Sequence, residues 1–288
     1  MSEYDQHINK ALADSHEKFS FPQNRWHRVQ PIIAANILSV LIIITVWQLV
    51  SLWIGHSRGI TFPSPWQTSD RLFAFFAGEG LYDQYIYQHL MASLERWASG
   101  YLLAVFIGIL VGLALGSFTV LYEICMPVVH VLQLIPGLAW IPIALLLFGL
   151  GDTSTIFMIF VMGVTPIILN TASGIRSIPP IYIKTARMMG GKRILLFFRV
   201  MLPAATLSIV GGLRIGLANS WRVLIAAEMI VGTGVGLGYS IIQSRWSLDF
   251  EAAFACVMII CFIGLTVEKL FFEILEKRIM IQMGLGQD

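Results

Sequence analysis

Long runs without charged residues are the feature that most constrains how this 288-residue chain can fold. Four stretches contain no Asp, Glu, Lys or Arg: 29–57, 97–122, 124–151 and 153–175. Each supplies the roughly 20 residues that an α-helix needs to cross about 30 Å of hydrocarbon. Only 12% of the residues are charged, about half the fraction usual in a soluble domain. The sequence therefore predicts an all-α membrane protein.

The apolar runs and their interruptions predict about six transmembrane helices. We expect them near 31–54, 93–118, 122–150, 155–171, 206–231 and 252–275. This divides the chain into an N-terminal tail, 1–30, a transmembrane domain, 31–279, and a C-terminal tail, 280–288. The first thirty residues lack an apolar core, so we expect no cleavable signal peptide.

The third expected span contains three prolines, Pro127, Pro136 and Pro142. Proline removes a backbone donor and breaks a helix. Broken backbone at membrane depth is tolerated only where it is buried in protein or lines a cavity. We therefore expect 134–142 to lie near an interior pathway. The second span repeats Gly108, Gly112 and Gly116 four residues apart, which predicts a helix-packing face.

Basic residues are unevenly distributed between the two sides of the membrane. One side carries Arg58, Arg71 and Arg96 in a longer loop and Arg245 after the fifth span. More occur in the first tail, between the fourth and fifth spans, and in the last tail: Lys10, Lys18, Arg25, Arg28, Arg176, Lys184, Arg187, Lys192, Arg193, Arg199, Lys277 and Arg278. With six spans these three regions share the other side, which the positive-inside rule makes cytoplasmic. Both termini are then expected in the cytoplasm. The opposite loop, 55–96, is expected to contain a short interfacial helix with exposed aromatic residues, serving as a structural cover or an external contact.

The chain shows no pattern of a cofactor-binding enzyme. Its three cysteines, Cys125, Cys256 and Cys261, have neither zinc nor disulfide spacing. The phosphate-binding pattern G-x-x-x-x-G-K-[ST] is missing from the sequence. We expect no metal and no cofactor, and no nucleic-acid partner.

The segment 184–203, "KTARMMGGKRILLFFRVMLP", interrupts the apolar chain with clustered positive charge. The proline pair before it suits a helix start, and Gly190 and Gly191 suit a helix end. A second short segment then leads to Pro203. The pattern predicts a cytoplasmic helix–Gly–helix element, 180–203, between spans four and five.

This element resembles the cytoplasmic "EAA" loop of ABC-importer permeases, in which E-A-A is followed after three residues by G, and nine residues later by an aliphatic residue, any residue and L-P. The positions that match are Ala186, Gly190, Val200, Leu202 and Pro203. Lys184 stands where the family has glutamate, and Thr185 where it has the first alanine. "LQLIPGLAWIPIALLLFGLGDTS", "TPIILNTASGIRSI", "LRIGLANSWRVLIAAEMI" and "GVGLGYSI" are similar to the nitrate/sulfonate/taurine-type permeases, and the likeness covers 47–279.

The resemblance implies an inner-membrane permease that forms the translocation pathway of an ATP-driven importer for a small, anionic solute. It implies a second permease copy, two cytoplasmic ATPase subunits that bind ATP and Mg²⁺, and an external binding protein. The ATPase-coupling residues would be Lys184, Thr185, Ala186, Arg187, Met188, Met189, Gly190, Gly191, Leu202 and Pro203. The main alternative is a self-sufficient secondary transporter, although such folds typically show internal repeats and the two halves show none. An intramembrane protease fits poorly, because nothing pairs a histidine with Ser173.

Charged residues within spans are costly and usually face a cavity or one another. Arg214 and Glu228 match positions of the family, and we expect them to be structural or gating charges. Arg222 has two interpretations of equal weight: an internal salt bridge, with Glu228 as the partner, or a contact to an anionic substrate. The candidate pathway residues are Trp140, Asn170, Asn219, Trp221 and Arg222.

Overall fold

The computed structural model describes residues 26–59, 61–232 and 234–282. Two units are distinguished along the chain, Met1–Pro65 and Trp66–Asp288, and each is described by itself. In the first unit, α2 runs over Trp26–Arg58. Trp47 Nε1 donates to the Pro63 carbonyl at 2.9 Å, which ties the chain after α2 back to that helix. Most of the expected N-terminal tail and the end of the C-terminal tail lie outside the described residues.

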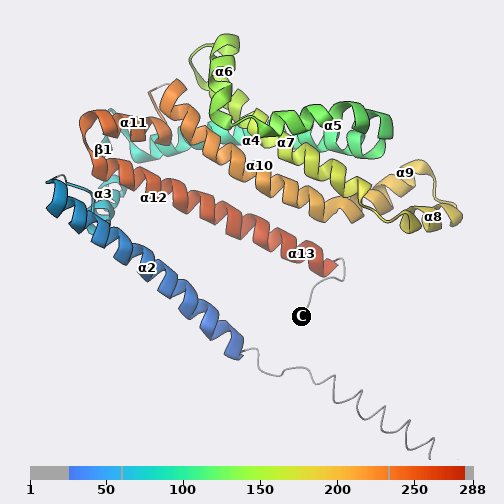
Figure 1. The fold of residues 1–288 in the computed structure, drawn as a ribbon, viewed down its shortest axis with the longest axis horizontal. Helices are drawn as coiled ribbons and strands as arrows, with labels where there is room; N and C mark the ends of the chain where they lie inside the picture. The colour runs from blue at the N-terminus through green and yellow to red at the C-terminus, as the bar shows by residue number, and fades with distance from the viewer. Residues whose placement is uncertain (1–25, 60, 233, 283–288) are drawn as a thin grey trace, which may run out of the picture. The chain divides into compact units, whose positions relative to one another are not determined.

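The second unit is almost entirely helical (Figure 1). Its elements are α3 (Pro65–Phe76), β1 (Gly80–Leu81), β2 (Gln84–Tyr85), α4 (Ile86–Ser117), α5 (Thr119–Leu134), η1 (Gly137–Trp140), α6 (Ile141–Phe148), α7 (Asp152–Arg176), α8 (Pro180–Met188), α9 (Arg193–Leu196), the π-helical η2 (Phe197–Met201), α10 (Leu202–Val231), α11 (Leu237–Ser247), α12 (Phe250–Thr266), the π-helical η3 (Val267–Glu273) and α13 (Ile274–Gln282). The strands β1 and β2 pair antiparallel.

Within the described ranges, five helical segments are long and apolar enough to cross a membrane: Ile37–Arg58, Ile86–Ser117, Asp152–Arg176, Ile194–Val231 and Phe250–Ile281. A sixth span forms if α5 and η1–α6 are taken together, and these two pieces meet at a bend of 104°. The bend falls at Pro136, inside the segment where the prolines predicted a break. The all-α membrane fold with about six spans is confirmed, with the third span sharply bent.

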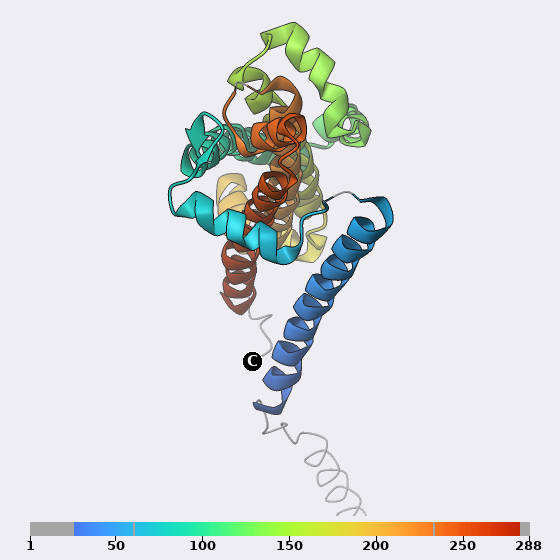
Figure 2. The same cartoon turned by 90° about the vertical axis from the view of Figure 1, so that its left-hand side faces the viewer.

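The helix α7 forms the centre of the second unit, since α4 and α10 both pack along it (Figures 1 and 2). The glycine stripe of α4 lies at the contact with α7. A Cβ atom on Gly112 would lie 2.6 Å from Thr171, and one on Gly116 would lie 2.7 Å from Ile175. These distances are shorter than van der Waals contact, so the predicted packing face is confirmed.

One end of the unit is closed by α3, the β1–β2 hairpin, α11 and the start of α12. Phe75, Leu81 and Leu237 meet in a small buried cluster at this end. Arg71 on α3 pairs with Asp249 at 3.0 Å, and the same carboxylate caps the first turn of α12. The short helix expected in the 55–96 loop is α3, and its Trp66, Phe73 and Phe76 are exposed, whereas Phe75 is buried.

Candidate functional site

The segment that resembles the coupling loop folds into α8, a tight turn and α9 (Figure 1). Pro180 stands in the first turn of α8, where a missing N–H costs nothing. Gly190 has φ of 82° and accepts this left-handed geometry because it lacks a Cβ. The Gly191 N–H then donates to the Ala186 carbonyl at 3.0 Å, which closes the end of α8.

The expected coupling residues fall into two groups. Lys184 to Gly191 lie on α8 and its turn, and Met188 and Met189 are 79% and 83% exposed. Leu202 and Pro203 begin α10 and follow η2 without a break. An exposed pair of methionines gives α8 an adaptable apolar tip. Nothing in the structure tests a coupling role for these residues, and it stays a prediction.

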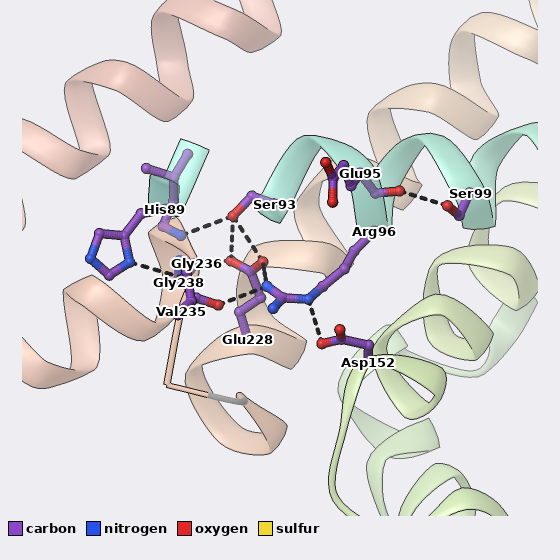
Figure 3. A network of polar contacts seen from close by, with 11 residues as sticks. His89, Ser93, Glu95, Arg96, Ser99, Asp152, Glu228, Val235, Gly236 and Gly238 are labelled. Carbon is purple, nitrogen blue, oxygen red and sulfur yellow. Dashed lines mark hydrogen bonds and ion pairs between the residues drawn. The ribbon is translucent and has the colours of Figure 1, made fainter. Parts of the chain in front are cut away.

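A buried polar network joins α4, α7, α10 and α11 near the opposite end of α10 (Figure 3). Its centre is Glu228, whose carboxylate is almost fully buried. The Ser93 hydroxyl donates to both carboxylate oxygens at 2.8 and 2.9 Å, and the Gly238 N–H donates to Oε2 at 2.9 Å. The network therefore holds the backbone at the start of α11 against α10.

Arg96 supplies the positive charge of this network. Its Nη1 donates to Glu228 Oε1 at 2.8 Å and to the Val235 carbonyl at 2.7 Å, while Nε donates to Asp152 Oδ1 at 2.6 Å. A buried charge is tolerated when it is paired and fully hydrogen-bonded. One guanidinium thus connects α4 to α7, α10 and the α10–α11 loop.

His89 and Gly236 complete the network on the α11 side. The Gly236 N–H donates to His89 Nδ1 at 3.0 Å, so this nitrogen carries the lone pair and Nε2 faces the Leu81 carbonyl at 3.3 Å. Gly236 has φ of 144°, and a Cβ there would lie 2.6 Å from the Glu228 carboxyl carbon. Gly236 and Gly238 of "GVGLG" are therefore required by the close approach of this loop to α10 and Glu228.

These contacts of Glu228 fit the expected structural charge, but its partners were not expected from the sequence. Arg96 was counted only as a loop charge, and Arg222 was named as the possible ion-pair partner. That interpretation is wrong, because Glu228 pairs with Arg96. His89 also belongs to the long helix α4 rather than to a loop. The spacing of His89, Ser93 and Arg96 on one helical face was the available signal.

Arg214 lies on α10 toward the end that joins the coupling segment. Its guanidinium donates to Glu268 of η3 at 2.8 Å and reaches Glu276 of α13 at 3.4 Å. These ion pairs join α10 to the last helical segments of the chain. The arrangement fits the expected structural role of Arg214, and no gating motion follows from it alone.

Arg222 has a different environment from Arg214. Its side chain is exposed in the single chain, and within the described ranges it forms no ion pair and no hydrogen bond. Asn219, one turn earlier on the same face of α10, is half-buried. A charge at this depth is expensive toward lipid and is normally directed to a cavity or to another protein surface.

The broken span approaches α10 beside Arg222. A Cβ on Gly137, at the start of η1, would lie 2.9 Å from the side chain of Val223. The bend between α5 and α6 therefore packs against the middle of α10. The break between α5 and η1 and the Arg222 side chain, which has no partner within the described ranges, therefore belong to neighbouring parts of the helix bundle.

The other pathway candidates are less accessible. Trp140 and Trp221 belong to the main hydrophobic core, where Trp221 packs edge-on against Trp97. The Asn170 amide donates to the Pro166 carbonyl of its own helix at 2.9 Å. The structure thus separates Arg222 and Asn219, on the accessible face of α10, from the tryptophans in the core.

Membrane-length helices around α7, with one broken span, define a polytopic α-helical membrane protein. Residues 104–281 match the family described as the binding-protein-dependent transport system inner membrane component. The match covers more than half of the chain, so the chain belongs to this family. It is an ABC-importer permease, as the motifs predicted, and a multi-pass protein of the inner membrane.

Several permeases are similar to this chain over most of their length. The chain is 31% identical over 254 residues to a nitrate import permease of Synechocystis, covering 87% of this chain and 90% of that one. It is 30% identical to the taurine transport system permease of Escherichia coli, covering 94% and 96%. It is 32% identical to a bicarbonate transport system permease of Synechococcus elongatus, covering 90% and 94%.

A solved structure shares the fold. An inward-facing structure of the MetNI methionine ABC transporter superposes with a TM-score of 0.55 and 17% identity. The superposition covers 67% of this chain and 97% of that chain. At this identity the likeness supports the fold alone.

Proposed function

We propose that this permease conducts a small inorganic or organic anion and that Arg222 contacts the anion within the pathway. The proposal rests on Arg222. This residue lies within a span, its side chain is exposed, and it has no partner in the described part of the chain. The similar permeases are named for nitrate, taurine and bicarbonate transport. All three solutes carry a negatively charged group that a guanidinium binds well.

The pathway in this proposal lies between two copies of the chain. The face of α10 that carries Asn219 and Arg222 would meet the same face of a second copy around a twofold axis. Two Arg222 guanidinium groups would then line one pathway. No Asp or Glu occurs between Asp152 and Glu228, and the Glu228 carboxylate of α10 is already paired with Arg96.

Energy would come from partner subunits. The sequence contains no phosphate-binding loop, so ATP and Mg²⁺ would be bound by two cytoplasmic ATPase subunits docked on α8 and its Gly190 turn. An external binding protein would deliver the solute to the opposite side. Both termini would lie in the cytoplasm with the coupling loop, as the distribution of lysine and arginine predicts.

Substitution of Arg222 tests this function directly. We expect Arg222→Leu to reduce ATP-driven uptake of nitrate, taurine or bicarbonate, whichever the wild type transports, by at least about tenfold, since one lost charge-assisted hydrogen bond contributes about 1.5–3 kcal/mol. Arg222→Lys should retain part of the transport. Uptake by Arg222→Leu equal to the wild type would contradict the assignment.

A further inference from the structure

A cavity lies where α4 ends beside α8, α9 and η2. Its volume is about 770 Å³, within the roughly 300–1,000 Å³ that small-molecule sites occupy. The walls are mainly apolar and include Leu113, Ala114, Ile183, Ile194, Phe197 and Met201. The cavity therefore combines the end of a membrane-spanning helix with the segment that resembles the coupling loop.

Arg187 supplies the charge in this apolar lining. It stands one helical turn after Ile183, and its guanidinium has no ion pair within the described ranges. Ser117 also lines the cavity, but its hydroxyl oxygen is buried in the protein and is not accessible from the cavity. Arg187 is therefore the charged group that can meet a ligand there.

The segment that forms α8, α9 and η2 carries only positive charges. Between Asp152 and Glu228 the sequence has no acidic residue but contains Arg176, Lys184, Arg187, Lys192, Arg193 and Arg199. This segment therefore contains no carboxylate that could neutralise Arg187. A ligand with an anionic head and an apolar tail would complement both the cation and the walls. Basic pockets at the membrane surface bind anionic lipid headgroups in this way.

We propose that the cavity is a binding site for one anionic phospholipid. An acyl chain would lie against Leu113, Ala114 and Phe197, and the phosphate would accept hydrogen bonds from Arg187. Met188 and Met189 at the tip of α8 are exposed and do not line the cavity. Lipid and a docked protein could therefore occupy different sides of α8, and the lipid would set the position of this helix relative to α4.

Lipid titration of the delipidated full-length chain tests the proposal. The probes are a phosphatidylglycerol and a phosphatidylcholine with the same acyl chains, and retained lipid is counted by native mass spectrometry. We expect one phosphatidylglycerol per chain to bind on the order of tenfold or more tightly than phosphatidylcholine, because the phosphatidylcholine headgroup carries no net charge. Arg187→Ala should abolish this preference, and Ala114→Phe should reduce binding of both lipids by filling the cavity.

Lys184→Ala is the matched control, since Lys184 is an exposed cation on the same helix outside the cavity lining. Its binding should equal that of the wild type. Equal losses for Lys184→Ala and Arg187→Ala would indicate a diffuse surface attraction and overturn the site. Equal binding of the two lipids, or unchanged phosphatidylglycerol binding in Arg187→Ala, would also overturn it. The readout is independent of transport, so Arg222→Leu should bind lipid normally whatever its uptake.

Discussion

At the residue scale, the Glu228 carboxylate accepts hydrogen bonds from α4 and α11 while it is carried by α10. The side chain of its partner Arg96 is 8% exposed. Arg96 also pairs with a second carboxylate, Asp152, whose side chain is 56% exposed. The two ion pairs of one guanidinium therefore lie in different environments. The buried pair contributes to the fixed position of the α10–α11 loop, and the exposed pair is screened by solvent.

This difference predicts unequal effects of two neutralising substitutions. Glu228→Gln removes the buried counter-charge of Arg96, leaves only the exposed Asp152 carboxylate, and should lower the free energy of unfolding by about 3–5 kcal/mol. Asp152→Asn should lower it by no more than about 1 kcal/mol, as is usual for exposed pairs. Thermal unfolding of the purified variants in one detergent measures both. A greater loss in Asp152→Asn than in Glu228→Gln would contradict the burial pattern.

At the element scale, α8 and its glycine turn form a compact unit at the end of the helix bundle. Gly190 provides a left-handed residue, and the exposed face of α8 presents Lys184 and two methionines. The proposed ATPase partner would dock on this face. Because Lys184 replaces the glutamate of the family pattern, the partner surface is expected to be acidic opposite it.

The charge at Lys184 therefore predicts a direction for assembly. Lys184→Glu should weaken co-purification of the ATPase subunits with the tagged permease, through repulsion from that acidic surface. Lys184→Gln, which removes the charge without reversing it, should have a smaller effect and serves as the control. Stronger assembly of Lys184→Glu than of the wild type would show that this account of the interface is wrong.

Some elements could be predicted from local sequence and others depended on distant contacts. Uncharged runs predicted the spans, the repeat of Gly108 and Gly112 predicted a helix-packing face, and prolines predicted the broken span. The 104° bend itself was not predictable, since proline marks a break without fixing the direction of the following helix. The Arg96–Glu228 pair spans 132 positions of sequence, and only tertiary packing brings it together.

At the scale of the whole molecule, membership of the binding-protein-dependent family and the helical membrane fold agree with a transport subunit. The buried Arg96 network joins helices at one end of the second unit, while the basic coupling segment lies toward the other end of α10. The accessible face of α10 with Arg222 lies between them. Three features therefore follow one another along α10: the proposed ATPase-coupling segment, the proposed anion contact at Arg222, and the buried Arg96 network.

The most direct test of the central claim is uptake by liposomes that contain the permease, its co-purified ATPase subunits and the external binding protein. With ATP inside and the anion outside, the account predicts accumulation that depends on ATP hydrolysis and disappears when the ATPase subunits are omitted. Accumulation by the permease alone, driven by an ion gradient and unaffected by ATP, would contradict it and indicate a secondary transporter.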